Sequence, residues 1–384
     1  MKPEKTKPDE KYLRALRKRY AKAGKKDRGE ILDEFVKTTG YHRKHAVEVL
    51  SGRYKRKERP WKRQRGRYYS DDDNRALWQL AEWFDQIGSK RLRAALDVEL
   101  PRLLTQGHLR VSDQTYQHLL EMSAATMDRV RSLIPVKERI LRGGTKPGSM
   151  LKSQVPIRTF ADWNDKQVGF VEIDLVQHEG GDSSGIFACT LNMTDVCTGW
   201  TEIVAVLNKA QVRVFNALKL SRQRLPFALL GVDSDNGGEF INDQLIRYCV
   251  QEHLTFTRGR VAHKNDNAYV EQKNWSVVRR LVGYDRYDSA KQVKIINHLY
   301  DVYRLYCNFF LPVTKLIRKD REGSHVVKVY DSPATPYQRV LNASTINKPD
   351  KAALTQQYDT LDMINLKQQI NTLKGELMHT VLRS

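Results

Sequence analysis

Helical periodicity dominates the first third of the chain. Apolar residues recur there at three- and four-residue spacing, as they do on the buried stripe of an amphipathic helix. This spacing predicts helices over residues 11–22, 28–37, 41–50, 71–86, 89–104, 112–121 and 123–133. Serine stands at or directly before the start of each of the last four, where its side chain is expected to cap the helix. The region should therefore be all-helical.

Two of these helices, 28–37 and 41–50, form a helix-turn-helix candidate around a turn at residues 38–40. The residues expected to face inward on the second helix are Ala46, Val47 and Leu50. With those residues inward, His42, Arg43, Lys44 and His45 are expected to face outward. They lie near the start of the helix, where a recognition helix that enters a major groove carries polar and basic groups. We therefore predict DNA contact through His42, Arg43 and Lys44; a plain helical hairpin with a solvated face is the alternative.

The helices over residues 71–133 form a second all-helical unit. It is either another helix-turn-helix module, with Arg129 and Arg131 outward, or a scaffold without DNA contact. A stretch that contains Gly and Pro, residues 142–149, follows it, and both residue types resist regular structure. This stretch is the best candidate for a domain boundary.

Downstream, the pattern changes to short strands that alternate with helices. Apolar runs and apolar–polar alternation predict strands over residues 168–176, 186–193, 198–206, 227–232 and 254–257. Helical spacing predicts helices over residues 208–224, 242–251 and 267–282. The first three strands form a meander and the later ones alternate with helices, so we expect an α/β layer with one mixed sheet.

The C-terminal region returns to helical spacing. Residues 289–310 are predicted as an amphipathic, aromatic-rich helix and residues 318–329 as a small strand pair. In the final helix an apolar stripe consists of Leu366, Ile370, Leu373, Leu377 and Val381. Such a stripe forms either a short coiled coil with a second copy or a contact with its own domain.

The charge of the chain is strongly positive and unevenly distributed. The net charge is +21 over 384 residues, and residues 1–70 hold 24 Lys or Arg against 9 Asp or Glu, which is +15 of that total. A polyanionic partner is expected at the N-terminal end. Residues 51–70 carry nine of these cations with aromatic residues between them, and Arg56, Arg63 and Arg65 are predicted DNA contacts, unless the segment is only a flexible charged linker.

The sequence gives little support for a membrane-bound or secreted protein. No run approaches the roughly 20 apolar residues of a membrane span, and no secretory segment opens the chain. The four cysteines have no CxxC pairing and are expected to be buried free thiols in a reducing compartment. We expect a cytoplasmic protein that is associated with the nucleoid when bound to DNA, and no membrane partner.

Three acidic residues stand where a carboxylate is unfavourable. Alternation along strand 168–176 places Asp174 in mid-strand among apolar residues, and Asp235 directly follows the apolar strand 227–232. Glu271 lies on a helical stripe that is otherwise apolar, formed with Ala268, Trp275, Val278 and Val282. For any one of them alone, a cap, a salt bridge or a surface position is the simpler explanation, but all three together are harder to dismiss.

Three inward acids at one sheet edge repel one another unless a cation neutralises them. An all-oxygen set selects a hard ion, Mg²⁺ or Mn²⁺. Two such ions about 3.5–4 Å apart support in-line phosphoryl displacement, so phosphodiester chemistry is expected.

The spacing of these acids resembles that of a known family. Asp174 is followed 61 positions later by Asp235, in Asp-Asn-Gly-Gly-Glu-Phe, and 35 residues separate Asp235 from Glu271. With Asn267 one turn before Glu271, and a segment over residues 194–202 that looks like the second hairpin of such cores, residues 160–310 resemble the integrase-type catalytic core of DDE transposases. That superfamily comprises bacterial insertion-sequence transposases and retroviral integrases. Because no cysteine precedes Cys189, the His/Cys zinc domain of retroviral integrases cannot form, which favours the bacterial branch.

The resemblance implies an RNase H-like fold with a mixed five-stranded sheet and two reactions at one site: phosphodiester hydrolysis at a transposon end, then 3′-OH strand transfer into target DNA. Asp174, Asp235 and Glu271 would be catalytic and would hold two Mg²⁺ or Mn²⁺ ions. Residues flanking the third acid would contact DNA: Lys264, Asn267, Lys273, Arg279 and Arg280. Nearby acids compete for the ligand roles: Glu172, Asp233, Glu239 and Asp266. Asp233 is the most serious rival, since it ends the same strand two residues before Asp235.

The expected organisation is multidomain. The predicted domains are a basic helix-turn-helix region with its linker (1–70), a second helical domain (71–142), a linker (143–160), the catalytic core (161–312) and a small C-terminal region that ends in a helix (313–384). The expected partners are transposon terminal repeats, target DNA and further copies of the chain on paired ends. A structure-specific nuclease with the same core, or a DNA-binding regulator with an inert core, are the alternatives.

Overall fold

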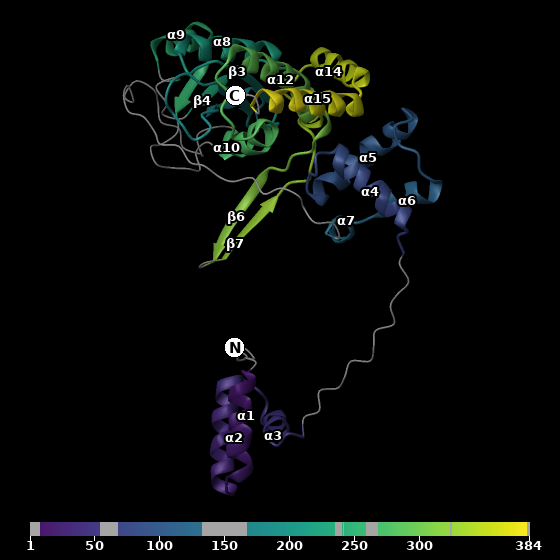
Figure 1. Ribbon diagram of the computed structural model, residues 1–384, viewed down its shortest axis with the longest axis vertical. Coiled ribbons are helices and arrows are strands. Elements are labelled where there is room, and N and C mark those ends of the chain that lie inside the picture. The colour runs from purple at the N-terminus through teal and green to yellow at the C-terminus, as the bar shows by residue number, and fades with distance from the viewer. Residues whose placement is uncertain are drawn as a thin grey trace. The chain divides into compact units, whose positions relative to one another are not determined.

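The chain forms two compact units, Met1–Tyr68 and Tyr69–Ser384, in a computed structural model (Figure 1). The residues that the structure describes are 8–53, 68–132, 167–234, 240, 242–258, 268–322 and 325–381. The predicted DNA contacts Arg56, Arg63 and Arg65 and the predicted linker 143–160 lie outside these ranges.

The described part of the N-terminal unit contains three helices around a small apolar core. The helices are α1 (Glu10–Lys22), α2 (Lys25–Thr39) and α3 (Arg43–Leu50). The core residues are Leu16, Ile31, Leu32, Phe35, Ala46, Val49 and Leu50. Gly40 ends α2 with a φ of 66°, a left-handed conformation that glycine adopts without a Cβ penalty. The prediction that Val47 faces inward is wrong: its side chain is 37% exposed, because Ala46, Val49 and Leu50 form the i, i+3, i+4 stripe instead.

The second helical unit contains α4 (Asp71–Trp83), α5 (Ser89–Thr105), α6 (Asp113–Glu121) and α7 (Ala124–Arg131). Ser70, Ser112 and Ser123 accept backbone hydrogen bonds as N-caps, as expected. Ser89 does not, because Gly88 is the N-cap and Ser89 is buried inside the first turn of α5. Helix α4 stops before Gln86, the predicted end, since Asp85 and Gln86 adopt positive φ angles of 54° and 52°.

Helices α4–α7 pack against the C-terminal helices of the compact unit Tyr69–Ser384. The Arg102 guanidinium of α5 donates to the carbonyl of Tyr358 at 2.8 Å and lies 4.2 Å from the centre of the Tyr358 ring. The Tyr306 hydroxyl donates to the carbonyl of Trp83 at the end of α4. The apolar residues of α4 and α5 belong to the same continuous core as those of the C-terminal helices.

A mixed five-stranded sheet forms the centre of the second compact unit, which confirms the predicted sheet. Its strands are β1 (Phe170–Gln177), β2 (Cys189–Asp195), β3 (Thr201–Val206), β4 (Gly231–Ser234) and β5 (Thr255–Arg258), in the order β3-β2-β1-β4-β5. The first three strands pair antiparallel, and β1, β4 and β5 pair parallel. Strand β4 starts four residues later than predicted. At its first residue, Gly231, an added Cβ would lie 2.6 Å from the Phe170 ring, so the approach of β4 to β1 requires glycine.

Helices cover both faces of the sheet. On one face, α8 (Gln211–Arg224) and α9 (Asp243–Gln251) share an apolar core with Val171, Ile173 and Leu175 of β1. On the other lie α10 (Ala268–Lys273), the π-helical turn η1 (Asn274–Arg279), α11 (Arg280–Val282) and α12 (Ala290–Phe310). The predicted single helix 267–282 is therefore interrupted by a π-helical segment.

The C-terminal region begins with a hairpin, β6 (Leu316–Glu322) and β7 (His325–Tyr330), which agrees with the predicted strand pair. Three helices follow: α13 (Pro336–Asn342), α14 (Lys348–Thr360) and α15 (Met363–Val381). Helix α15 lies beside α12 (Figure 1), and Leu366, Ile370, Leu373 and Leu377 are buried there. The stripe is thus covered by its own chain and is not exposed for a coiled coil. No helix among the described residues is long and apolar enough to cross a bilayer.

Candidate functional site

Asp174 lies in the middle of β1 on the face that α10 and η1 cover. Successive side chains of a strand alternate between faces, and Val171, Ile173 and Leu175 occupy the opposite face. Asp174 is half-buried, whereas Glu172, two residues earlier on the same face, is fully buried. Asp174 is therefore the more accessible acid of this strand.

Asn274, the first residue of η1, holds the Asp174 side chain. Its amide nitrogen donates to Asp174 Oδ2, and its amide oxygen accepts from Asn192 Nδ2 at 2.7 Å. Asn192 faces Asp174 across the β1–β2 pair, and its own oxygen accepts from the Thr194 hydroxyl at 3.3 Å. A chain of amides from β2 to η1 thus orients one carboxylate.

Neither Asn274 nor Asn192 was anticipated from the sequence. Asn274 stands three residues after Glu271, which is one helical turn, and this spacing was the available signal. Of the expected inward stripe, Val278 and Val282 are buried as predicted, but Trp275 is wrong, since it is 48% exposed. The π-helical segment begins at Asn274, whose side chain reaches Asp174 on the sheet.

Asp174 alone of the predicted trio has a described side chain. Asp235 lies outside the described residues; β4 ends at Ser234, directly before it, and Ser234 pairs with Ile173 of β1. Glu271 belongs to α10, and only its backbone is described. Within the described ranges, no three His, Cys, Asp or Glu side chains cluster closely enough to hold a metal ion.

Two of the rival acids are buried beside Asp174. Glu172 accepts a hydrogen bond from the Val270 backbone at 3.0 Å, and Asp233 accepts one from the Thr257 hydroxyl. The two residues are neighbours in the β1–β4 register, and both are fully buried. The other rivals, Glu239 and Asp266, lie outside the described residues.

The acids on this face offer oxygen donors, although no three of the described ones cluster as a metal site. Glu172, Asp174 and Asp233 all lie on the face of the sheet that α10 and η1 cover, with side-chain oxygens of Asn192 and Thr194 nearby. A site that offers oxygen ligands alone favours Mg²⁺ or Mn²⁺ over softer metals. Of the three acids, Asp174 is the partly accessible one.

The predicted DNA contacts after Glu271 are largely engaged within the protein. Arg279 donates to the carbonyl of Gln177 at 2.8 Å and lies 4.7 Å from the Tyr284 ring centre. Arg280 donates to the carbonyl of Asp85 at 2.8 Å, which ties α11 to the loop after α4. Lys273 is half-buried, and burial together with the charges of Arg91 and Arg339 lowers its pKa, an effect that a nearby Cys307 opposes.

Asn267 and Lys264 lie outside the described residues. In the second helical unit, Arg129 is exposed, whereas Arg131 points inward. The Arg131 guanidinium donates to the carbonyl of Ile87 at 2.7 Å, so it braces the loop before α5.

His178, at the end of β1, is a buried neutral group on the same side of the sheet. Its Nε2 lies 2.7 Å from the Thr190 hydroxyl, which in turn lies 2.8 Å from the Tyr300 hydroxyl. Burial, helped by the charge of Arg279, lowers the pKa of His178 to about 3. The imidazole therefore stays uncharged at neutral pH.

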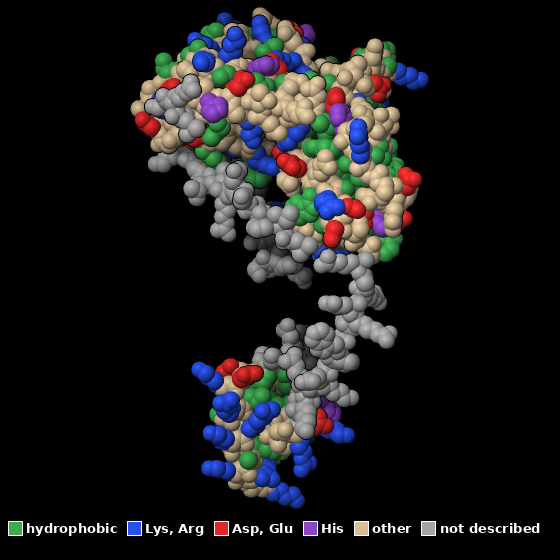
Figure 2. Space-filling view, turned by 45° about the vertical axis from the view of Figure 1, so that its right-hand side comes forward, with side chains coloured by type: hydrophobic (Ala, Val, Ile, Leu, Met, Phe, Trp, Pro, Cys, Tyr) green, Lys and Arg blue, Asp and Glu red, His purple; other side chains and the backbone are tan. Residues whose placement is uncertain are grey.

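The predicted contacts of the N-terminal unit are at the surface. His42, Arg43 and Lys44 are exposed at the start of α3. Arg43 forms an ion pair with Asp33 of α2, and the His42 ring accepts from the Lys44 backbone as the N-cap. Lys and Arg side chains are spread over the visible face of this unit (Figure 2).

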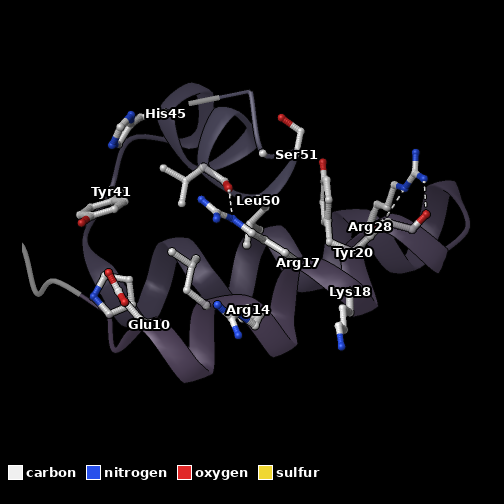
Figure 3. A pocket seen from close by; sticks show the side chains of 15 residues that line it. Glu10, Arg14, Arg17, Lys18, Tyr20, Arg28, Tyr41, His45, Leu50 and Ser51 are labelled. Atoms are coloured by element: carbon white, nitrogen blue, oxygen red, sulfur yellow. Dashed lines mark hydrogen bonds between the residues drawn. The ribbon is translucent and has the colours of Figure 1, made fainter. Parts of the chain in front are cut away.

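A groove of about 1140 Å³ opens between α1 and α3 (Figure 3). Its lining includes the cations Arg14, Arg17, Lys18 and Arg28 and the aromatic residues Tyr20 and Tyr41. The excess of Lys and Arg over residues 1–70 was evident from the sequence, but this groove was not.

Comparisons with known proteins gave one close relative in sequence. No protein-family model matches the chain. The uncharacterized protein y4rM of Sinorhizobium fredii is 44% identical over 331 residues, which are 85% of this chain and 93% of the relative.

Solved structures that match the chain include retroviral integrases. The catalytic core domain of HTLV-2 integrase in complex with magnesium is 13% identical, with 36% of this chain and 84% of that chain covered and a TM-score of 0.28. The catalytic core domain of BIV integrase is 16% identical, with 45% and 94% covered and a TM-score of 0.30. The simian T-cell lymphotropic virus intasome in complex with a PP2A regulatory subunit is 11% identical, with 56% and 69% covered and a TM-score of 0.31.

Proposed function

The chain belongs to the same family as the uncharacterized protein y4rM of Sinorhizobium fredii, and from its own residues we propose that it is a DNA transposase of the DDE type. Its activity would be metal-dependent hydrolysis of a phosphodiester at a transposon end, followed by transfer of the freed 3′-OH into target DNA. The proposed fold is RNase H-like, which the order and directions of the five strands support.

The observation that carries this proposal is the position of Asp174. An acid in the middle of a central strand costs free energy unless its environment compensates for it. Here the Asn274 amide donates to Oδ2 and the Leu175 backbone N–H donates to Oδ1 at 2.7 Å, while the carboxylate stays half-buried rather than sealed in the core. A pre-oriented, accessible carboxylate is what a metal ligand requires.

Asp235 and Glu271 complete the proposed site from two further elements. Asp235 follows β4, the strand that pairs with β1, and Glu271 belongs to α10, whose next residues reach Asp174 through Asn274. With all three carboxylates as ligands, two Mg²⁺ or Mn²⁺ ions would activate the attacking hydroxyl and stabilise the leaving oxygen. The three carboxylates would hold the ions in place, and the ions and carboxylates together would fix the position of the DNA phosphate.

The expected DNA partners are the terminal repeats and the target, with the N-terminal unit as a DNA-binding module. Two observations support this part of the proposal: the excess of Lys and Arg over residues 1–70 and the exposed start of α3. We propose further that the protein acts as a homo-oligomer on paired ends.

A strand-transfer assay tests the proposed chemistry. Pre-cleaved duplex DNA ends, a plasmid target and Mn²⁺ are incubated with the wild type and with Asp174→Asn, Asp235→Asn and Glu271→Gln. We expect joined products from the wild type and none above background from the three variants. Asp359→Asn, at an exposed position of α14, removes the same charge outside the proposed site and should leave joining unchanged.

The outcome also separates the alternatives. Cleavage of the ends without joining would indicate a structure-specific nuclease. Salt-dependent DNA binding without either reaction would indicate a regulator with an inert core. Joining by the three variants at the wild-type rate would refute the proposed site.

A further inference from the structure

The groove between α1 and α3 combines an open shape with a strong excess of positive charge. Glu10 is the acidic residue in its lining, against Arg14, Arg17, Lys18 and Arg28. Leu13, Val49 and Leu50 form an apolar floor. The groove is therefore shaped to take a ligand and charged to take an anionic one.

Two of the four cations form hydrogen bonds to backbone carbonyls of the same unit. Arg17 donates to the carbonyl of Val49 at 2.8 Å and so joins α1 to the last turn of α3. Arg28 donates to the carbonyls of Tyr20 and Ala21 at 3.0 and 2.9 Å, near the end of α1. Figure 3 shows Arg17 between the two helices, with its dashed bond toward α3.

The other two cations have no acidic partner among the described residues. Arg14 and Lys18 are exposed, stand one helical turn apart on α1 and line the same groove. By contrast, Arg43 at the start of α3 is paired with Asp33. The uncompensated charge of this unit thus lies on the α1 side as much as on the predicted recognition helix.

We propose that the α1–α3 groove binds the sugar–phosphate backbone of duplex DNA, with Arg14 and Lys18 as the phosphate contacts. The groove proposal rests on the proposed DNA-binding function and names the surface through which DNA is bound. The Cβ atoms of residues four apart on a helix are about 5–6 Å from each other, so the side chains of Arg14 and Lys18 can contact neighbouring phosphates of one strand. Arg17 acts as a positioning residue, because its hydrogen bond to Val49 joins the two helices that form the groove, whereas Arg28 joins α2 to the end of α1.

The contact is expected to be independent of sequence. Lys and Arg side chains that meet phosphates fix register and orientation but read no bases. The exposed start of α3, with His42 and Lys44, remains available for base contact at the same time.

Equilibrium binding of the full-length chain to a random-sequence duplex tests the proposal. Fluorescence anisotropy is measured between about 50 and 200 mM salt, the range over which phosphate contacts change affinity steeply. The variant is Arg14→Gln with Lys18→Gln. The matched control is Lys26→Gln with Lys37→Gln, which removes the same charge from exposed positions of α2 outside the groove.

We expect the groove variant to bind about tenfold more weakly at low salt and to lose roughly 0.9 per contact from the slope of log K against log salt. The control should lose clearly less on both measures. Equal losses in the two variants, or an unchanged slope in the groove variant, would overturn the proposal, as would a wild type that binds no duplex DNA. Circular dichroism of both variants checks that the helices persist, which is expected because all four side chains are exposed.

The result is distinguishable from failure of the proposed function. If the wild type neither cleaves nor joins DNA but the groove variant still loses affinity, the groove assignment stands and the transposase proposal falls. If the wild type joins DNA and the groove variant binds as well as the control, the groove assignment alone falls.

Discussion

The side-chain amide of Asn274, on the π-helical turn η1, donates a hydrogen bond to the carboxylate of Asp174 in the middle of β1. The same side chain accepts from Asn192 of β2, so Asn274 links β2 to the carboxylate of β1. Hydrogen bonds of this kind fix the rotamer of a ligand before the metal binds.

Replacing Asn274 by Ala should slow metal-dependent DNA joining by about 10- to 100-fold, the usual effect of removing a residue that orients a metal ligand. DNA affinity measured without metal should not change, because Asn274 orients Asp174 rather than contacting phosphate. Asn371→Ala, at an exposed position of α15, is the control. Joining at the wild-type rate by Asn274→Ala, over a full Mn²⁺ titration, would remove the positioning role.

Asp233 and Asp235 should respond differently to the same substitution. Asp233 is fully buried and accepts from the Thr257 hydroxyl, so Asp233→Asn should lower the free energy of unfolding by about 1–3 kcal/mol. Asp235→Asn should abolish joining and also the stabilisation by Mn²⁺, measured as the shift in thermal midpoint. The ligand role would move to Asp233 if Asp233→Asn lost activity and the Mn²⁺ shift while its stability in the absence of metal stayed unchanged.

His178 should make the protein less stable in acid. Burial first, and then the charge of Arg279, lowers its pKa from 6.5 to about 3 in the folded state. Below pH 6.5 the unfolded chain therefore binds a proton that the folded chain does not. Stability is lost as the pH falls from 6.5 toward 3, with a slope that approaches about 1.4 kcal/mol per pH unit from this one group.

Urea unfolding of the wild type and of His178→Gln between pH 7 and pH 4 measures this contribution as the difference in slope. The variant will be less stable overall, since a buried ring is lost, but its stability should fall less steeply with acid. His298→Gln, at an exposed position of α12, should keep the wild-type slope. Parallel curves for the wild type and His178→Gln would show that His178 takes up its proton without unfolding.

Arg102 should be a major link between the second helical unit and the C-terminal helices. Its guanidinium donates to the carbonyls of Tyr358 and Leu361 and lies over the Tyr358 ring. Arg102→Ala leaves these partly buried carbonyls without a donor, so we expect a loss of about 2–4 kcal/mol in the free energy of unfolding. Arg110→Ala, an exposed change in the same unit, should stay within about 0.5 kcal/mol of the wild type in chemical denaturation. A similarly small effect for Arg102→Ala would contradict the proposed link.

Local patterning was a good guide to most elements of this chain. The helices from α1 to α7 and the five strands follow from apolar spacing, because amphipathic periodicity is a property of neighbouring residues. Helices α13 and α14 were missed, since they are short or weakly patterned and begin at Pro336 and after Asn347. The extent of β4 was also misjudged, because an apolar run does not show where pairing with β1 starts.

The sequence by itself determined that Asp174 stands in mid-strand on the face opposite Val171, Ile173 and Leu175, since alternation along a strand is a local rule. Only the tertiary structure decided which side chain holds it. Asn274 is 100 residues away along the chain, and it stands at the start of a π-helical turn that has no signature in the apolar spacing. The tertiary structure also decided how the α15 stripe is buried. Its burial depends on α12 lying beside it rather than on its own pattern.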